Sequence, residues 1–285
     1  MFLQIEAEDI IASPLFLLIV LLLCLGLSLL HRVFPRLISA SLLKGCVVAS
    51  GILSVWEILS FMGLLSPVLL PAPSKVFSNI VHLWAIGFLQ SQIFSTLFRL
   101  VYAFVLALIS AVTLAIIVSF FSKLSFLESF ADATRLIPAP AWLSLSILWF
   151  GIGYASAIFI IWLGCFFPIF LNTLNGVNKA EQIQVEAVLT VGGGKFDVLW
   201  EVLLPVSYQH ILAGARIGLG IGWITVITAE LASVDIGAGL GWMIQDSRIL
   251  LDMTTVLSGI FLVGLLGSMT DIVLRKFDGL VQGWS

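Results

Sequence analysis

The chain carries little charge. Of its 285 residues only 10% are Asp, Glu, Lys or Arg, whereas 60% are hydrophobic. An average soluble domain is about 25% charged, so this composition excludes an ordinary soluble fold and indicates a membrane protein. The sequence also lacks a basic patch interleaved with aromatic residues, so we expect no nucleic-acid interface. The net charge of −3 points to no particular partner.

Cysteine and histidine are equally scarce, with three of each. Neither residue type shows the spacing of a zinc site, and the cysteines lie inside apolar segments, where a disulfide framework is not expected. The hydrolase patterns Gly-x-Ser-x-Gly and His-Glu-x-x-His are missing as well. We therefore expect no metal, no cofactor bound by this chain and no catalytic residues.

What the sequence has in abundance is long apolar runs, each long enough, alone or with its flanks, for a helix to cross about 30 Å of hydrocarbon. The runs are continuously apolar rather than alternating, which favours helices over a barrel. The prediction is an all-α membrane bundle, with one extra amino-terminal helix at 14–30 and six core spans. The core spans are expected near 43–63, 93–119, 126–148, 155–176, 208–231 and 254–274.

The distribution of basic residues gives an orientation. Three acidic residues precede the first apolar run, which argues against a cleaved signal peptide and for an amino end outside the cytoplasm. Eight of the thirteen Lys and Arg then fall in segments on the cytoplasmic side, among them Lys179 and Lys195. The predicted division is an extra helix and turn at 1–42, followed by one membrane domain at 43–285. The segment 178–205 lies in the cytoplasm in this topology.

Two segments on the opposite side are not simple turns. Prolines at 71 and 73 stop a helix, and Ser74 is expected to cap a new one that runs to about residue 83. Residues 233–252 are rich in glycine and charge and are predicted to form a loop at the outer opening. The glycines near 218–222 are attributed to helix packing, and those near 237–241 to loop flexibility.

The cytoplasmic segment 178–205 is polar and broken by glycine. Its first part has the spacing of a short amphipathic helix, three glycines at 192–194 end it, and a second helix is expected from Phe196 to Leu203. Gly192-Gly193-Gly194-Lys195 is not a phosphate-binding loop, because Phe follows the lysine and no strand precedes the glycines. The segment is therefore expected to dock on a partner by helix-in-groove recognition.

The spacing of Glu186-Ala187, Gly192 and Pro205 resembles the EAA loop of ABC-importer membrane subunits. Further segments resemble permeases of the nitrate, sulfonate, taurine and bicarbonate type. They cover about 50–280 in the family's order and include Leu70-Pro71-Ala72-Pro73-Ser74-Lys75, Trp149-Phe150-Gly151-Ile152-Gly153, Ala229-Glu230 and Gly239-Leu240-Gly241-Trp242. The triple glycine and Val188 depart from the usual pattern, and the helix at 14–30 is outside it.

This resemblance implies a type I ABC-importer permease of the bacterial inner membrane. It implies three kinds of partner: a second permease copy in a homodimer, a cytoplasmic ATPase dimer that uses the ATP, and an external substrate-binding protein. Glu186, Ala187, Gly192 and Pro205 would then carry ATPase coupling. The cargo would be a small anion such as an alkanesulfonate, taurine, nitrate or bicarbonate, with a slight preference for sulfonates.

Charged residues inside lipid usually face a bundle interior or a cavity. Arg135, Arg99 and Glu230 are therefore candidates for the translocation pathway, with Arg135 first because Pro138 and Pro140 are expected to kink its helix. The alternative for these residues is a structural ion pair, Arg135 or Arg99 with Glu230. Asn172, Asn175 and Thr173 are expected to bond between helices. The competing function is an ion-coupled secondary transporter that uses Glu57 and Glu230.

Overall fold

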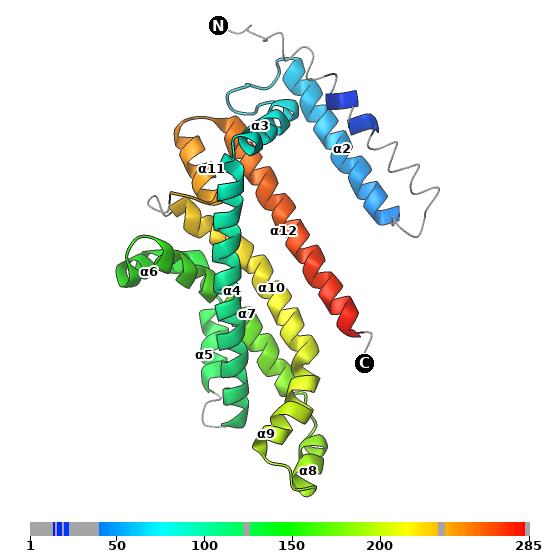
Figure 1. The fold of residues 1–285 in the computed structure, drawn as a ribbon, viewed down its shortest axis with the longest axis vertical. Helices are drawn as coiled ribbons and strands as arrows, with labels where there is room; N and C mark the ends of the chain where they lie inside the picture. Colours follow the sequence, from blue (N-terminus) through cyan, green and yellow to red (C-terminus); the bar gives the residue numbers. More distant parts are fainter. Residues whose placement is uncertain are drawn as a thin grey trace. The chain divides into compact units, whose positions relative to one another are not determined.

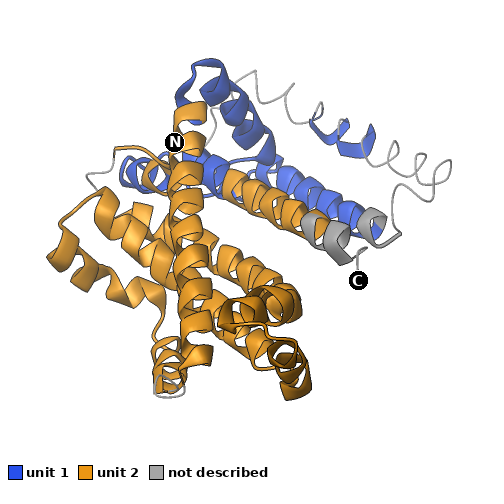
Figure 2. Cartoon of the chain, turned by 60° about the horizontal axis from the view of Figure 1, so that its bottom comes forward, with its two compact units in different colours: residues 1–89, 244–260 blue, residues 90–243, 261–285 orange. Residues whose placement is uncertain are grey.

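The computed structural model describes residues 14, 16–18, 20–22, 40–121, 126–232 and 237–282. Every regular element in these ranges is helical (Figure 1). The chain divides into two compact units (Figure 2): residues 1–89 with 244–260, and residues 90–243 with 261–285. The extra helix predicted at 14–30 lies largely outside the described residues, and the separate element at 1–42 stays a prediction.

Five of the described helical stretches are long and apolar enough to cross a membrane. They are Lys44–Phe61, Phe88–Phe120, Tyr154–Val177, Lys195–Ala232 and Met253–Lys276. These five correspond to the first, second, fourth, fifth and sixth predicted core spans, so the all-α membrane architecture is confirmed. The third predicted span differs.

The predicted helix at 126–148 is broken into three pieces. They are α5 (Phe126–Thr134), the 3₁₀ turn η2 (Ala139–Trp142) and α6 (Leu143–Phe150). Pro138 and Pro140 have no N–H to donate and cannot continue a helix from α5, so the expected kink is a complete break. Residues 139–150 extend only about 18 Å even if fully helical. No single piece is long enough to cross the hydrocarbon core alone, and the prediction of one continuous third helix was wrong.

In the first unit, α2 (Ala40–Phe61) and α3 (Pro73–Ala85) are joined by a buried carboxylate. The backbone N–H of Ser74 donates to Glu57 Oε2 at 3.0 Å, and the Ser74 hydroxyl donates to Glu57 Oε1 at 2.8 Å. The N-cap residue of α3 is Ala72, which makes no capping bond of its own. The expected Ser74 cap was therefore wrong: Glu57 satisfies the start of α3 from the neighbouring helix.

The same unit ties α3 to the first turns of α12 (Met253–Gln282) through side-chain hydrogen bonds. Asn79 Nδ2 donates to Thr255 Oγ1 at 3.0 Å and to Ser258 Oγ at 3.2 Å. Hydrogen bonds between polar side chains are a common way to hold helices together in lipid, where no hydrophobic force drives them together. Glu57 and Asn79 thus act as structural residues of this unit.

The second unit is built on α4 (Phe88–Phe120), α7 (Tyr154–Val177) and α10 (Leu204–Ala232). Gly214 and Gly218 let α10 approach α7 closely, because a Cβ on Gly214 would lie 3.0 Å from Ile169 Cα and one on Gly218 would lie 3.0 Å from the Cys165 carbonyl oxygen. Gly222 packs in the same way, whereas Gly220 faces open space. The helix-packing interpretation is thus confirmed for 218 and 222 but not for 220.

Candidate coupling and translocation sites

The segment 178–205, predicted to lie in the cytoplasm, forms two short helices that pack on each other. The first is α8 (Gln182–Thr190) and the second is α9 (Lys195–Val198). Val185 and Val188 of α8 are half-buried against a small cluster that includes Val198 and Leu203, while Ile183 and Leu189 are exposed. The expected amphipathic pattern is therefore only partly right, because α8 has apolar side chains on its inner and its outer face. Exposed apolar side chains on a short surface segment are typical of a docking surface.

Glycines close α8 as predicted. Gly192 has φ +90°, a left-handed conformation that side chains rarely adopt, and the Gly193 N–H donates to the Val188 carbonyl at 3.0 Å. A Cβ on Gly193 would lie 2.6 Å from Val188 Cγ1, so this position also needs glycine for space. Gly194 donates its N–H to Asp197 Oδ2 at 2.6 Å and starts α9. Each of the three glycines thus has its own local task.

The second part of the segment is continuous with a membrane span. The π-helical turn η3 (Leu199–Leu203) follows α9 and leads directly into α10, so a single helical rod runs from Lys195 to Ala232. Pro205 stands in the first turn of α10 and has no N–H, and the wide turn ahead of it makes the Leu204 N–H to Leu199 carbonyl bond instead. The prediction of a separate helix at 196–203 is corrected by this continuity.

The other predicted coupling residues lie on the surface of α8. Glu186 is exposed and accepts a hydrogen bond from Gln182 Nε2 at 3.0 Å, and Ala187 is exposed beside it. Gly192 and Pro205 are exposed as well. Their coupling role stays a prediction, and their surface exposure is what a docking role requires.

Inside the second unit, Arg99 of α4 and Glu230 of α10 form an ion pair in which both side chains are 0% exposed. Arg99 Nη2 also donates to the Ala238 carbonyl at 2.7 Å, and its guanidinium carbon lies 4.7 Å from the centre of the Tyr154 ring. The Thr96 hydroxyl lies 2.9 Å from both carboxylate oxygens. This is the ion-pair alternative, with Arg99 as the partner, and a role for the pair in translocation stays a prediction.

The ion pair belongs to a larger cluster that satisfies the start of α11 (Leu240–Ile249). Three successive backbone N–H groups, those of residues 239–241, donate to Gln92 Oε1 at 2.6 Å, Thr96 Oγ1 at 2.8 Å and Glu230 Oε2 at 2.9 Å. Free N–H groups at a helix start are costly when buried. Side chains from α4 and α10 therefore cap α11, although Gln92 and Thr96 of α4 are 147 and 144 residues away from the N–H groups that they accept.

This arrangement overturns the predicted outer loop at 233–252. Residues 240–249 are helical, and residues 233–236 lie outside the described residues. Gly239 has φ +130°, and a Cβ there would lie 2.5 Å from Glu230 Cδ. A Cβ on Gly241 would lie 2.7 Å from Glu230 Cβ. These two glycines serve close approach to the carboxylate rather than flexibility.

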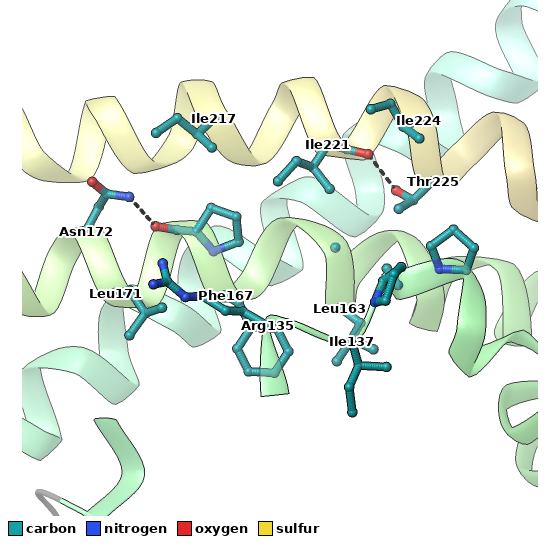
Figure 3. A pocket seen from close by; sticks show the side chains of 15 residues that line it. Arg135, Ile137, Leu163, Phe167, Leu171, Asn172, Ile217, Ile221, Ile224 and Thr225 are labelled. Atoms are coloured by element: carbon teal, nitrogen blue, oxygen red, sulfur yellow. Dashed lines mark hydrogen bonds between the residues drawn. The ribbon is translucent and has the colours of Figure 1, made fainter. Parts of the chain in front are cut away.

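A pocket of about 480 Å³ lies in the second unit between the α5–η2 break, α7 and α10 (Figure 3). Such a volume is within the range of small-molecule sites, roughly 300–1,000 Å³. Among the described residues that line it, Arg135 is the only ionisable one. Figure 3 shows its guanidinium toward the Asn172 end, with Ile224 and Thr225 at the other end. The structure thus places Arg135 at a cavity and keeps Arg99 and Glu230 out of it.

The remaining polar candidates bond locally. Asn172 Nδ2 donates to the Pro168 carbonyl at 2.8 Å and Thr173 Oγ1 to the Ile169 carbonyl at 2.7 Å, both within α7, so the predicted interhelical bonds of these two side chains were wrong. Arg216 of α10 pairs with Asp271 of α12 at 3.0 Å, a contact that the sequence did not predict. In the sequence, this pair is indicated only by two opposite charges on two apolar spans.

The fold defines a polytopic membrane protein with five long apolar helices, and comparison with known proteins specifies its class. Residues 10–282 match the family described as binding-protein-dependent transport system inner membrane component, and the chain belongs to this family. It is similar to the taurine transport system permease protein TauC of Escherichia coli (strain K12), at 33% identity over 82% of this chain and 86% of that protein.

Two further relatives cover similar shares. A putative ABC transporter permease protein of Methanocaldococcus jannaschii is 34% identical over 81% of this chain and 87% of its own length. The bicarbonate transport system permease protein CmpB of Synechococcus elongatus is 26% identical over 82% and 86%. The chain is therefore an inner-membrane transport subunit of an ABC importer, with a type I permease fold. ATP hydrolysis belongs to a separate ATPase subunit, and substrate delivery belongs to a binding protein.

Proposed function

We propose that two copies of this chain form the translocation pathway for a small anion, and that the chain itself binds no cofactor. The anion class is supported by relatives named for taurine, aliphatic sulfonates and bicarbonate. It is also supported by the lone cation of the pocket at α5, α7 and α10. An ATPase dimer would dock on the 182–198 segments of the two copies.

The observation that carries this proposal is the unbroken helical rod from Lys195 to Ala232. Its cytoplasmic end packs on α8, and its middle supplies Ile217, Ile221 and Ile224 to the pocket. Movement of a docked ATPase against α8 and α9 would therefore be transmitted to the pocket wall through one rigid element. Glu186 and Ala187 on the exposed surface of α8 would contact the ATPase, and Gly192 and Pro205 would set the angles at the two ends of the segment.

The competing ion-coupled mechanism is not favoured. It needs a carboxylate that can take up and release an ion from the pathway. Glu57 is engaged with Ser74, and Glu230 with Arg99 and Gly241, in a fully buried setting. Both carboxylates thus have structural partners within their own units.

The test is uptake in proteoliposomes that contain the permease, its ATPase and its binding protein. Replacing Gly192 with Val should abolish most ATP-driven uptake, because a branched residue at φ +90° distorts the end of α8. The span and pocket should stay intact, so the variant should insert and purify normally. Gly220→Val, at a position with open space in α10, is the matched control. Normal uptake by Gly192→Val, with the ATPase still bound, would refute the coupling assignment.

A further inference from the structure

The pocket at α5, α7 and α10 has a cationic end and a mostly apolar wall, and an inorganic anion would interact favourably with the cationic end alone. One end carries a guanidinium, and most of the wall is hydrocarbon: Ile137, Leu163, Phe167, Ile217, Ile221 and Ile224. A small hydrated anion gains nothing from such a wall and loses water on entering it. The wall therefore needs its own explanation, beyond the presence of a cation.

The Arg135 guanidinium forms an ion pair with Asp132 through one of its three nitrogens. Arg135 Nε lies 3.2 Å from Asp132 Oδ1, and both side chains are about half exposed, at 55% and 51%. Within the described ranges, the two terminal nitrogens of Arg135 have no hydrogen-bond partner, and their edge is the one that matches two oxygens of a sulfonate or carboxylate. Arg135 thus has the donors for a second anion besides Asp132.

The stretch of α7 along the pocket also offers polar atoms. Pro168 cannot donate the hydrogen bond that the Gly164 carbonyl would accept in an unbroken helix, and Asn172 is turned toward the Pro168 carbonyl. Gly164, Pro168 and Asn172 all line the pocket. The Asn172 amide keeps one N–H and its oxygen for other partners. A head group held by Arg135 would therefore meet the Asn172 amide beside it, while the chain behind it would meet isoleucines.

We propose that this pocket is a selectivity site for amphiphilic organic anions, with an oxyanion head at Arg135 and a short aliphatic part along the wall from Ile217 to Ile224. The inference rests on the proposed transport function and narrows it from small anions in general to those with a hydrocarbon portion. Nitrate and bicarbonate have an oxyanion head but no group for the wall, so they are poor ligands of this site. Specificity is then checked twice, by the binding protein and by the membrane subunit.

The apolar wall predicts how binding affinity should change with the length of the ligand's alkyl chain. Burying one methylene is worth a factor of about four in affinity. Binding should therefore strengthen about fourfold per methylene from ethanesulfonate to butanesulfonate and then level off as the pocket of about 480 Å³ fills. The head group should contribute a factor of about 10 to 100, as expected for hydrogen bonds to a charged group.

The experiment measures equilibrium binding of ethanesulfonate, butanesulfonate, hexanesulfonate and nitrate to the permease–ATPase complex in phosphatidylcholine nanodiscs, without the binding protein. Arg135→Gln should weaken every sulfonate about 10- to 100-fold. Ile217→Thr with Ile224→Thr keeps the branched shape and should flatten the dependence on chain length. The matched controls are Arg275→Gln and Ile109→Thr, both exposed and outside the pocket, and they should bind like the parent.

Three results would overturn the inference. Nitrate binding as tight as butanesulfonate would remove the role of the wall, and unchanged binding by Arg135→Gln would remove the role of the cation. Displacement of the sulfonates by phosphatidylglycerol added to the nanodiscs would identify the occupant as an anionic lipid. If Arg135→Gln fails to assemble, the paired threonine variant still decides between a flat and a steep chain-length dependence.

Failure of this inference and failure of the proposed function give different results. If the intact complex with its binding protein imports an anion but the pocket variants leave its selectivity unchanged, the transport function stands and the selectivity site does not. If no anion stimulates ATPase activity or is imported, the proposed function itself fails.

Discussion

Two arginines in the same unit illustrate how differently one residue type is used in a membrane subunit. Arg99 is fully buried, and its partners Glu230, Ala238 and Tyr154 come from three different parts of the chain. Arg135 is half exposed beside a cavity and meets only Asp132, three residues earlier. An unpaired charge is costly inside a membrane protein, and the two sites accommodate their cation in opposite ways. Arg99 is neutralised within the fold, whereas Arg135 keeps donors for a ligand.

The comparison also separates stability from function. The Arg99–Glu230 pair lies in the cluster that caps the first turn of α11, where Glu230 accepts the Gly241 N–H and a hydrogen bond from Thr96, so its loss should affect folding first. Nothing in the described fold rests on Arg135 to a similar degree. Its loss should affect the anion first. Four variants probe this difference, and they are taken from the largest expected effect to the smallest.

Glu230→Ala should be the most damaging change. It leaves the Arg99 cation buried and unpaired, which typically costs about 3–5 kcal/mol of folding free energy. Thermal unfolding in detergent should show a large loss, together with a low yield of monodisperse protein. The double variant Arg99→Met with Glu230→Leu should recover much of the loss, because it removes both charges. If the single variant were as stable as the double one, the ion pair would not organise this region.

Gly239→Val should come next. The φ of +130° disfavours any side chain by about 1–3 kcal/mol, and the added Cβ would meet the Glu230 carboxylate. The expected outcome is a lower unfolding temperature and faster hydrogen exchange in the first turn of α11. Gly220→Ala, in open space on α10, is the control and should be neutral or slightly stabilising. Normal protection of residues 240–243 in Gly239→Val would show that the close approach is not required.

Arg135→Gln should change folding stability by less than about 1 kcal/mol, since it removes only an exposed ion pair. Unfolding should therefore occur close to the parent temperature, while anion binding falls. Arg99→Gln, which changes the same residue type in the buried cluster, is the informative contrast and should be strongly destabilised. Equal losses of stability in the two variants would erase the distinction between the two arginines.

Asp132→Asn should have the smallest effect. It removes the partner of Arg135 Nε without touching the pocket wall, so stability should shift by only about 0.5 kcal/mol. Anion binding should become slightly tighter, because Asp132 no longer competes for the guanidinium. The measurement is butanesulfonate binding at low and high salt, with Glu128→Gln on the same short helix as control. Weaker binding in Asp132→Asn would mean that the carboxylate positions Arg135 instead of competing for it.

The architecture was largely predictable because a span needs only a local property, about 20 apolar residues in a row. Five of the six predicted core spans are found as continuous helices, and the glycine stop after α8 lies where the pattern of residues 186–205 placed it. The third predicted span is not a continuous helix, and the reason is also present in the sequence. Pro138 and Pro140 suggested a kink, but only the packing on α7 shows that the chain leaves the helical path altogether.

The polar sites were predictable only as sets of candidates. Arg99, Arg135 and Glu230 were all recognised as unusual charges in apolar helices, and either arginine was a possible partner of Glu230. Likewise, Glu57 was seen as a candidate ion-coupling residue, whereas it caps α3 through Ser74. Composition shows that a charge must find a partner in lipid, but it does not show which residue far along the chain will supply that partner.

The sequence by itself thus determined what depends on neighbouring residues: five of the membrane spans and the glycine stop that ends the short helix α8. Tertiary structure alone decided what depends on contacts between distant segments. It paired Glu230 with Arg99, which is 131 residues away, and it turned the presumed outer loop into the capped helix α11. It also left Arg135 beside a largely apolar pocket. Apolar periodicity is read from consecutive residues, whereas the choice between two arginines requires their positions in space.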